Sequence, residues 1–195
     1  MSKVLLIIDP QYDFCEGGSL PVNGANNAMA KLGEYITENA KEYTSIIVTS
    51  DWHPYTHCSF NTEGGKWPVH CVQHTHGAAI AQPVIDAVNK SNVPYIVCYK
   101  GNNEDREEFS VFKNSDSCSE IKKMLTLSKV FSKEDVDRID ICGIAGDVCV
   151  LDSLKDGMRE FPSISFTVLE EFTPSIDGGD TLHKFVEQSE RVEFG

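Results

Sequence analysis

The stretch Val4-Leu5-Leu6-Ile7-Ile8 is an unbroken apolar run, and the charged residue Asp9 follows it directly. Apolar runs without polar alternation are typical of strands that are buried on both faces of a parallel sheet. Further short runs rich in β-branched residues lie downstream, at 45–49, 95–98, 138–142 and 163–168. The sequence therefore predicts a sheet of buried parallel strands that begins at residues 4–8.

Amphipathic segments separate these runs. In the first segment Met29, Leu32 and Ile36 fall on one face of a helix. The pattern recurs in four later segments, which contain Ile80, Val84 and Val88; Ile121, Met124 and Leu125; Val148, Leu151, Leu154 and Met158; and Leu182, Phe185 and Val186. Strands that alternate with helices imply right-handed crossovers and helices on both faces of the sheet. The predicted fold class is α/β, a doubly wound three-layer sandwich with a mostly parallel central sheet, in a single domain over residues 1–195.

The composition narrows the class of partner. A formal net charge of -13 argues against nucleic acid and anionic membranes, because no basic patch could offset that field. The longest apolar runs are far shorter than the ~20 residues that span a bilayer. Seven cysteines without paired spacing, and an N-terminus without a secretory signal, predict a reduced, cytoplasmic protein. A small neutral molecule is the expected partner.

Reactive side chains occur at or just beyond the ends of four predicted strands. Asp9, Asp51 and Lys100 follow the first three runs, and Cys149 lies a few residues beyond the fourth. Each residue alone has a common structural role, such as a helix cap, a solvated lysine or a small buried thiol. Open α/β sheets, however, bind ligands beyond the carboxyl ends of their strands. The convergence of four such groups on one rim predicts a catalytic site.

Acyl-transfer chemistry would use these groups in complementary roles. A thiol with a pKa near ~8.5 is only slightly ionised at neutral pH, so a nucleophilic cysteine needs a base, a cation or a helix N-terminus nearby. Asp9 could take the thiol proton, and Lys100 could stabilise the resulting charges. The turn that precedes Cys149 would expose backbone N–H groups to an oxyanion.

A second cluster has the composition of a metal site. Asp51, His53 and His57 lie within seven residues, and His70 follows later in the same long loop. Carboxylates and imidazoles are typical ligands of Zn, Fe and Mn, which the sequence does not separate. Three or four such ligands leave coordination positions open, as a catalytic ion requires. A structural zinc module that uses Cys58 and Cys71 is a weaker hypothesis, because the two lack C-x2-4-C spacing. The remaining histidines are predicted at the surface, namely His74, His76 and His183.

Four sequence blocks carry a family resemblance. They are IDPQYDFCEGGSL at 8–20, DWHP at 51–54, WPVHC at 67–71 and GIAGDVC at 143–149. In this order, over nearly the whole chain, they resemble nicotinamidases of the isochorismatase-like hydrolase family. The second and third blocks are specific to the nicotinamidase and pyrazinamidase branch. The resemblance implies the isochorismatase-like hydrolase fold and hydrolysis of nicotinamide to nicotinate and ammonia through a cysteine thioester, with pyrazinamide as a further substrate.

The resemblance also implies roles for individual residues. Asp9, Lys100 and Cys149 match the catalytic triad of the family, with Cys149 as the nucleophile. A cis peptide at Ile144-Ala145 is expected to orient the backbone N–H groups of Ala145 and Cys149 toward the oxyanion. The implied cofactor is one divalent metal ion, Zn in preference to Fe or Mn, that holds the pyridine nitrogen. The matching ligands are Asp51, His53 and His70, with His57 at a position that supplies an additional ligand in some members, and the aromatic pocket walls match Phe14 and Trp67.

Two segments depart from the family pattern. Gly146 stands where the family commonly has Thr, which removes a side-chain hydrogen bond that would support the turn. Residues 107–112 read EEFSVF where Asp-x-Tyr-Ser-x-Phe is more usual, so substrate access or contacts within a homo-oligomer are expected to differ. Two alternative hypotheses stay open at this point: another amide or vinyl-ether hydrolase of the same superfamily, and a noncatalytic metal-binding or redox-sensing protein.

Overall fold

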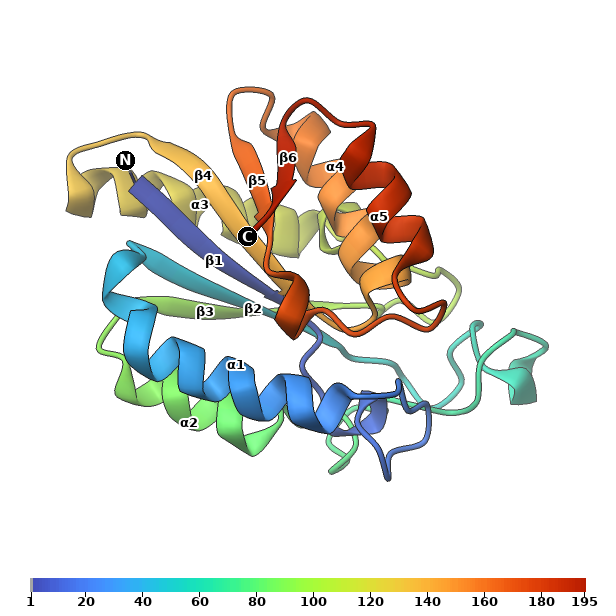
Figure 1. Ribbon diagram of the computed structural model, residues 1–195. Helices are drawn as coiled ribbons and strands as arrows, with labels where there is room; N and C mark the ends of the chain where they lie inside the picture. Colours follow the sequence, from blue (N-terminus) through green and yellow to red (C-terminus); the bar gives the residue numbers. More distant parts are fainter. Residues whose placement is uncertain (1) are drawn as a thin grey trace.

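A computed structural model describes residues 2–195, which form a six-stranded, wholly parallel sheet between two layers of helices (Figure 1). The strand order is β3-β2-β1-β4-β5-β6. The strands are β1 (Ser2–Ile8), β2 (Ser45–Asp51), β3 (Tyr95–Lys100), β4 (Val136–Gly143), β5 (Ser165–Val168) and β6 (Val192–Phe194). The helices are α1 (Ala25–Asn39), α2 (Gln82–Lys90), α3 (Ser115–Ser132), α4 (Leu151–Glu160) and α5 (Asp180–Glu187). The predicted α/β fold with three layers is confirmed.

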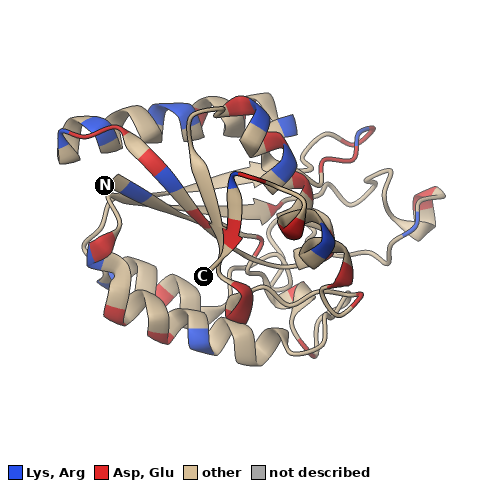
Figure 2. Cartoon of the chain, turned by 45° about the horizontal axis from the view of Figure 1, so that its top comes forward, with Lys and Arg blue, Asp and Glu red and all other residues tan. Residues whose placement is uncertain are grey.

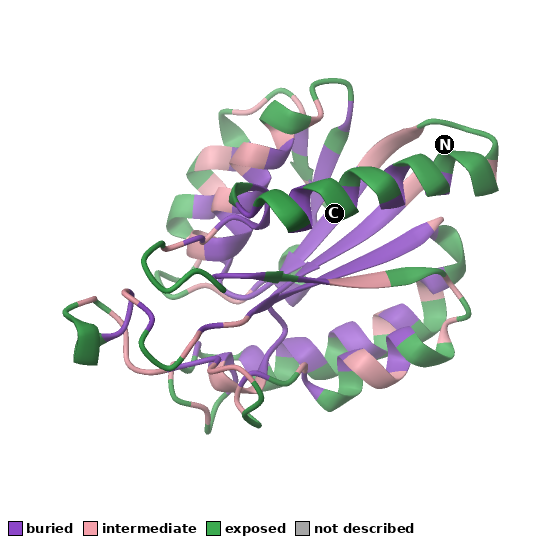
Figure 3. Cartoon of the chain, turned by 180° about the vertical axis from the view of Figure 1, so that it is seen from behind, coloured by how far each residue is buried: buried purple, intermediate pink, exposed green. Residues whose placement is uncertain are grey.

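Burial of both sheet faces explains the apolar runs. On β1, Leu5 and Ile7 pack in the cluster that includes α1 and α2, whereas the intervening Leu6 packs in the cluster that includes α3, α4 and α5. Side chains of a strand point alternately to the two faces, so a strand covered on both sides must be apolar at every position. Figure 3 shows the result: the central strands are buried and exposed residues lie on the outer helix surfaces.

The chain reverses its direction across the sheet between β1 and β4. From β1 it proceeds through α1 to β2 and β3, and then α3 returns it to the other side of β1. Such a reversal separates the loops that leave the two adjacent strands, which opens a crevice at their carboxyl ends. Asp9, which follows β1, and Cys149, which follows β4, therefore lie on the two sides of this crevice.

Two details of the prediction were wrong. Ile80 was expected on the second helix, but it precedes α2 and instead forms an isolated bridge with Gln11. The helix begins only at Gln82 because Pro83, in its first turn, favours a helix start. The sixth strand was missed, since three residues at 192–194 give too little alternation to be recognised.

Charged side chains of both signs lie on the helices that cover the sheet (Figure 2). Lys and Arg are interspersed with Asp and Glu along the helices in the view of Figure 2. Within residues 2–195, no helix combines the length and the apolar character that a bilayer crossing requires.

Candidate active site

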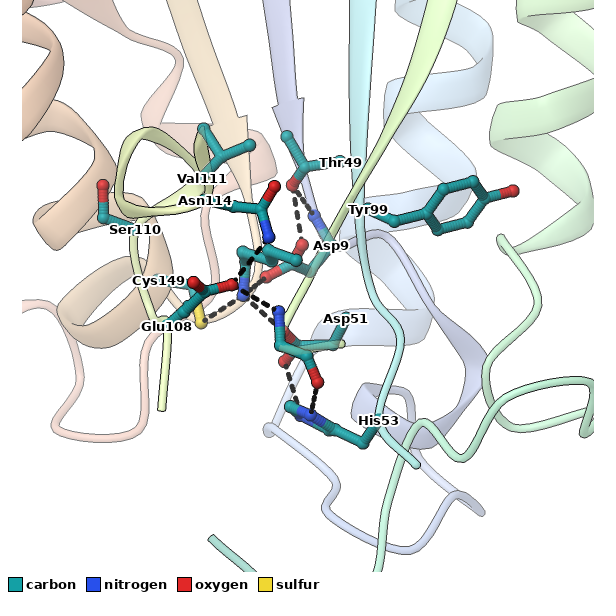
Figure 4. Close-up of polar contacts among 12 residues, drawn as sticks. Asp9, Thr49, Asp51, His53, Tyr99, Glu108, Ser110, Val111, Asn114 and Cys149 are labelled. Carbon is teal, nitrogen blue, oxygen red and sulfur yellow. Dashed lines mark hydrogen bonds and ion pairs between the residues drawn. The ribbon is translucent and has the colours of Figure 1, made fainter. Parts of the chain in front are cut away.

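Lys100 is the centre of the cluster predicted at the rim of the sheet. It ends β3 directly beside Asp51, the last residue of β2, and it is fully buried. Its Nζ lies 2.8 Å from Asp9 Oδ2, 2.5 Å from Asp51 Oδ1 and 3.6 Å from Cys149 Sγ. Figure 4 shows Asp9, Asp51 and Cys149 approaching one another from the ends of β1 and β2 and from the turn after β4. The structure therefore brings together all four reactive groups that the strand ends suggested.

Burial controls the protonation of these groups. Burial raises the pKa of Asp9 to about 6, although the charge of Lys100 opposes this shift. Burial likewise raises the pKa of the Cys149 thiol well above its usual range, against the influence of Lys100. The pKa of Lys100 is lowered by burial but raised more strongly by Asp51 and Asp9, so it stays an ammonium. At neutral pH the resting cluster thus contains a protonated thiol beside a carboxylate that can accept its proton.

Two polar side chains that the sequence analysis missed hold the cluster in place. Thr49 Oγ1 donates to Asp9 Oδ1 at 2.6 Å and accepts from the Asp9 backbone N–H at 3.1 Å. The Gln11 amide accepts from Asp51 N–H and donates to Asp51 C=O, both at 2.8 Å. Thr49 precedes Asp51 by two residues on β2, so period-two alternation was a usable signal for its position.

Asp51, His53 and His70 form a group that fits a divalent metal. One potential ligand atom from each lies within 4.8 Å of the others, and all three residues are buried. His53 Nδ1 is 2.8 Å from the Gly101 carbonyl, and His70 Nδ1 is 2.7 Å from the Pro68 carbonyl. A carbonyl only accepts, so each Nδ1 carries the proton and each Nε2 lone pair is available to a metal. The donor set, one carboxylate and two imidazoles, suits Zn and similar ions.

His57 lies beside this group rather than within it. Its ring packs against His53 with a centroid distance of 4.1 Å, and its own ligand atom groups with His53 and Glu107. His57 Nδ1 is 2.7 Å from Ser59 Oγ, and Nε2 is 3.1 Å from the Arg106 carbonyl. Both nitrogens are therefore engaged, and His57 would have to give up one of these hydrogen bonds to bind a metal.

The other groups of metal-binding residue types do not suggest further sites. Asp9, Asp51 and Cys149 also approach one another, but the ammonium of Lys100 contacts all three and would repel a cation. His74 and His76 are exposed, and His183 Nε2 lies 2.7 Å from Glu170 Oε1 on the outside of the molecule. These three histidines lie at the surface, as predicted.

A mainly apolar pocket opens between Cys149 and the group formed by Asp51, His53 and His70. Phe14 and Trp67, both expected as pocket walls, line it. Phe14 packs against the ring of His70, and Trp67 meets Phe109 edge to face. The remaining lining residues are Leu20, Val22, Asp51, His70, Glu107, Phe109, Ala145, Val148, Cys149 and Ile176. Flat apolar walls with Cys149 on one side and Asp51 and His70 on another suit a small aromatic ring.

The turn that carries Cys149 is held by backbone contacts. It contains the expected cis peptide between Ile144 and Ala145, and Cys149 lies in the π-helical turn Gly146–Val150. Within residues 2–195 the Ala145 N–H has no hydrogen-bond partner, so it is free to donate to an oxyanion. Gly143 is required here because its φ is +120° and a Cβ would lie 2.0 Å from the Ile8 carbonyl oxygen.

The expectation that Gly146 weakens this turn is not supported by its surroundings. The Gly146 N–H donates to the Pro174 carbonyl at 2.9 Å, and a Cβ at this position would lie 2.3 Å from Ser175 Oγ. The Asp147 carboxylate accepts from the backbone N–H groups of Ile176 and Asp177 at 2.8 and 3.1 Å. The glycine therefore admits a neighbouring segment that anchors the turn in place of a threonine side chain.

The fold and the site together define a hydrolase of the α/β class in which a cysteine and a carboxylate both contact a buried lysine. The family model for the isochorismatase domain matches residues 3–160, and the chain belongs to this family. A nicotinamidase/pyrazinamidase of Mycobacterium tuberculosis is 31% identical over 183 residues, which cover 92% of this chain and 90% of that protein. The family resemblance read from the sequence is thereby confirmed.

Solved structures agree with this assignment. The pyrazinamidase of Pyrococcus horikoshii in complex with zinc matches with a TM-score of 0.80 and 28% identity, over 100% of this chain and 99% of that chain. The yeast nicotinamidase bound to the inhibitor nicotinaldehyde matches with a TM-score of 0.79 and 25% identity, over 95% of this chain and 94% of that chain.

Proposed function

We propose that this protein is a nicotinamidase that hydrolyses nicotinamide to nicotinate and ammonia. The observation that carries the proposal is the contact of Lys100 with Asp9 and Cys149 at a flat apolar pocket that also reaches Asp51 and His70. Relatives named nicotinamidase and pyrazinamidase, similar over most of their length, support the same substrate class. The seven cysteines, all free thiols, support a reducing, cytoplasmic location.

Asp9 and Cys149 divide the proton transfers and bond changes between them. Asp9 takes the thiol proton as Cys149 Sγ attacks the carboxamide carbon, and the N–H groups of Ala145 and Cys149 stabilise the tetrahedral oxyanion. Protonated Asp9 then gives its proton to the departing nitrogen, so the C–N bond breaks and ammonia leaves a thioester. Asp9 next takes a proton from the attacking water, and collapse to nicotinate returns that proton to the sulfur.

Lys100 keeps a cation in contact with both buried carboxylates throughout this cycle. Its ammonium contacts both buried carboxylates and stays protonated, so Asp9 can cycle between its two protonation states without leaving an unpaired charge. Proximity to Sγ, at 3.6 Å, also favours the thiolate that forms during attack.

One divalent metal ion, proposed as Zn with Fe or Mn as alternatives, would be held by Asp51, His53 and His70. His57 is proposed as an additional ligand after it releases one of its hydrogen bonds. When bound, the ion supplies a Lewis acid for the pyridine nitrogen. Phe14 and Trp67 pack against the ring faces, exclude water and direct the carboxamide toward Cys149.

Purified protein incubated with nicotinamide tests the proposed function directly. We expect ammonia and nicotinate in equal amounts, and pyrazinamide should be hydrolysed as well. Absence of both products with Zn, Mn and Fe in turn would contradict the proposal. Metal binding without ammonia release would instead favour a noncatalytic metal-binding protein.

Removal of the metal is expected to abolish turnover reversibly. Dialysis against a chelator should stop ammonia release, and Zn should restore it. His70→Ala should weaken Zn binding by more than about 100-fold, because even changes to outer-shell partners of zinc ligands cost ~10–100-fold. His76→Ala is the matched control, since its exposed ring packs on Tyr12 away from the group. Metal content can be measured by atomic emission; full Zn occupancy in His70→Ala would contradict the ligand assignment.

Thr49→Val is expected to lower kcat about tenfold with little change in KM, since it removes the hydroxyl that orients the Asp9 carboxylate. Thr49→Ser retains the hydroxyl and should recover most of kcat. Steady-state ammonia release at saturating and limiting nicotinamide separates the two parameters. A shift confined to KM, or equal losses in both variants, would show that Thr49 acts through packing alone.

A further inference from the structure

Glu108 is a buried carboxylate that the proposed mechanism does not use. It lies in the loop after β3 and is completely shielded from solvent. Its Oε2 accepts from the Gly101 N–H at 3.1 Å and from Asn114 Nδ2 at 2.8 Å, and its Oε1 accepts from Arg106 Nε at 2.9 Å. The pKa of Glu108 is lowered overall, because the hydrogen bonds from Arg106, Asn114 and Gly101 outweigh the opposite effect of burial. The side chain is therefore ionised. An ionised carboxylate with every contact satisfied is a rigid anchor.

The Gly101 residue that Glu108 holds also contacts the metal-binding group. Its carbonyl accepts from His53 Nδ1 at 2.8 Å, while its N–H donates to Glu108. Its φ of +67° favours glycine, and a Cβ would lie 2.4 Å from His53 Cε1. In Figure 4 Glu108 and Asn114 lie next to each other, and His53 lies below them in the view. One residue therefore connects the buried carboxylate to the ring of a proposed metal ligand.

The loop that contains Glu108 also contacts the ring of His57. The Arg106 carbonyl is 3.1 Å from His57 Nε2, and the Arg106 guanidinium pairs with Glu108. Both histidines thus take their orientation from residues 101–108. Glu108 stands at an unspecified position of the family pattern Asp-x-Tyr-Ser-x-Phe, so the pattern itself assigns it no role.

We infer that Glu108 is a positioning residue for the metal centre: through Gly101 it fixes the orientation of His53 and the tautomer that leaves Nε2 free. This inference rests on the metal site of the proposed function. Carbonyl and carboxylate partners of zinc-binding histidines generally contribute to metal affinity in this way, and their loss costs ~10–100-fold. The loop after β3 thereby contributes to the metal centre through Glu108, whereas the sequence had suggested a role for residues 107–112 in substrate access or subunit contacts.

Two substitutions separate the contact with Gly101 from the charge of Glu108. Glu108→Gln keeps a carbonyl oxygen within reach of the Gly101 N–H but removes the charge. Glu108→Asp keeps the charge but is one methylene too short to reach. The Zn dissociation constant of the metal-free proteins can be measured by competition with a chromophoric chelator, without nicotinamide. We expect Glu108→Asp and Glu108→Ala to bind Zn ~10–100-fold more weakly, and Glu108→Gln to stay within about threefold of the unsubstituted protein.

Glu104→Ala is the matched control, because it removes an exposed carboxylate from the same loop and should leave Zn affinity unchanged. Thermal unfolding of each metal-free variant reports whether the fold is intact. Unchanged Zn affinity in Glu108→Asp, or equal losses in Glu108→Gln and Glu108→Asp, would overturn the inference. The tautomer of His53 in ¹⁵N-histidine NMR spectra is a second readout, and loss of the Nδ1–H form is expected in Glu108→Asp and Glu108→Ala but not in Glu108→Gln. Because the binding assay contains no nicotinamide, its failure is distinct from a failure of the unsubstituted protein to release ammonia.

Discussion

Cys149→Ala is expected to reduce ammonia release from nicotinamide by at least about 10⁴-fold, because it removes the sulfur that would form the thioester. Zn affinity should be retained, since the sulfur is not part of the group formed by Asp51, His53 and His70. Ammonia release over several hours and Zn competition on the same preparation measure the two properties separately.

Cys149→Ser is a second test of the nucleophilic role of Cys149. A hydroxyl is a weaker nucleophile and a poorer leaving group than a thiol, so this variant should also be nearly inactive. Cys118→Ala is the control, because Cys118 lies on α3, outside the pocket and the reactive cluster. Ammonia release from Cys149→Ala close to that of the control would remove Cys149 from the mechanism.

The sheet could be predicted from the sequence because strands that are buried on both faces form recognisable apolar runs. Val4–Ile8 is apolar at every position and the four runs that follow are rich in β-branched residues, as is typical of parallel strands under two helix layers. The predicted ends of two strands were too early. Asp51 and Lys100 are the last residues of β2 and β3, although their polarity suggested that the strands had already ended. Only the three residues of β6 lacked any such pattern.

The reactive residues were predictable for the same reason: each occupies a strand end or the turn that follows it. The residues that hold them were harder to find. Thr49 and Gln11 lie two positions from Asp51 and Asp9, so alternation would have placed them nearby, but not their hydrogen bonds. Ile176 and Glu108 reach the pocket and the metal-binding group through loop conformations that tertiary contacts determine, and local sequence carries no signal for those.

Lys100→Met is expected to abolish turnover and also to destabilise the metal-free protein by about 3–5 kcal/mol, because removing one partner of a buried ion pair leaves uncompensated charge. In this protein two carboxylates lose their cationic partner, since the ammonium contacts both Asp9 and Asp51. Urea unfolding and ammonia release give the two quantities. A variant as stable as the unsubstituted protein would show that the carboxylates do not depend on Lys100.

The double variant Asp9→Asn/Lys100→Met separates electrostatic support from catalysis. It removes one carboxylate together with the cation, so it should regain much of the lost stability while staying inactive, because Asn cannot accept the thiol proton.

The pH dependence of stability should show the same origin in Asp9. Burial already raises the pKa of Asp9 to about 6, above its unfolded value of 3.8, and loss of the lysine would raise it further. A raised carboxyl pKa stabilises the fold at low pH and loses that contribution as pH rises through the folded pKa. Lys100→Met should therefore be less stable at pH 8 than at pH 5, relative to the unsubstituted protein, whereas the double variant should lack most of this dependence; equal dependence in both would contradict an origin in Asp9.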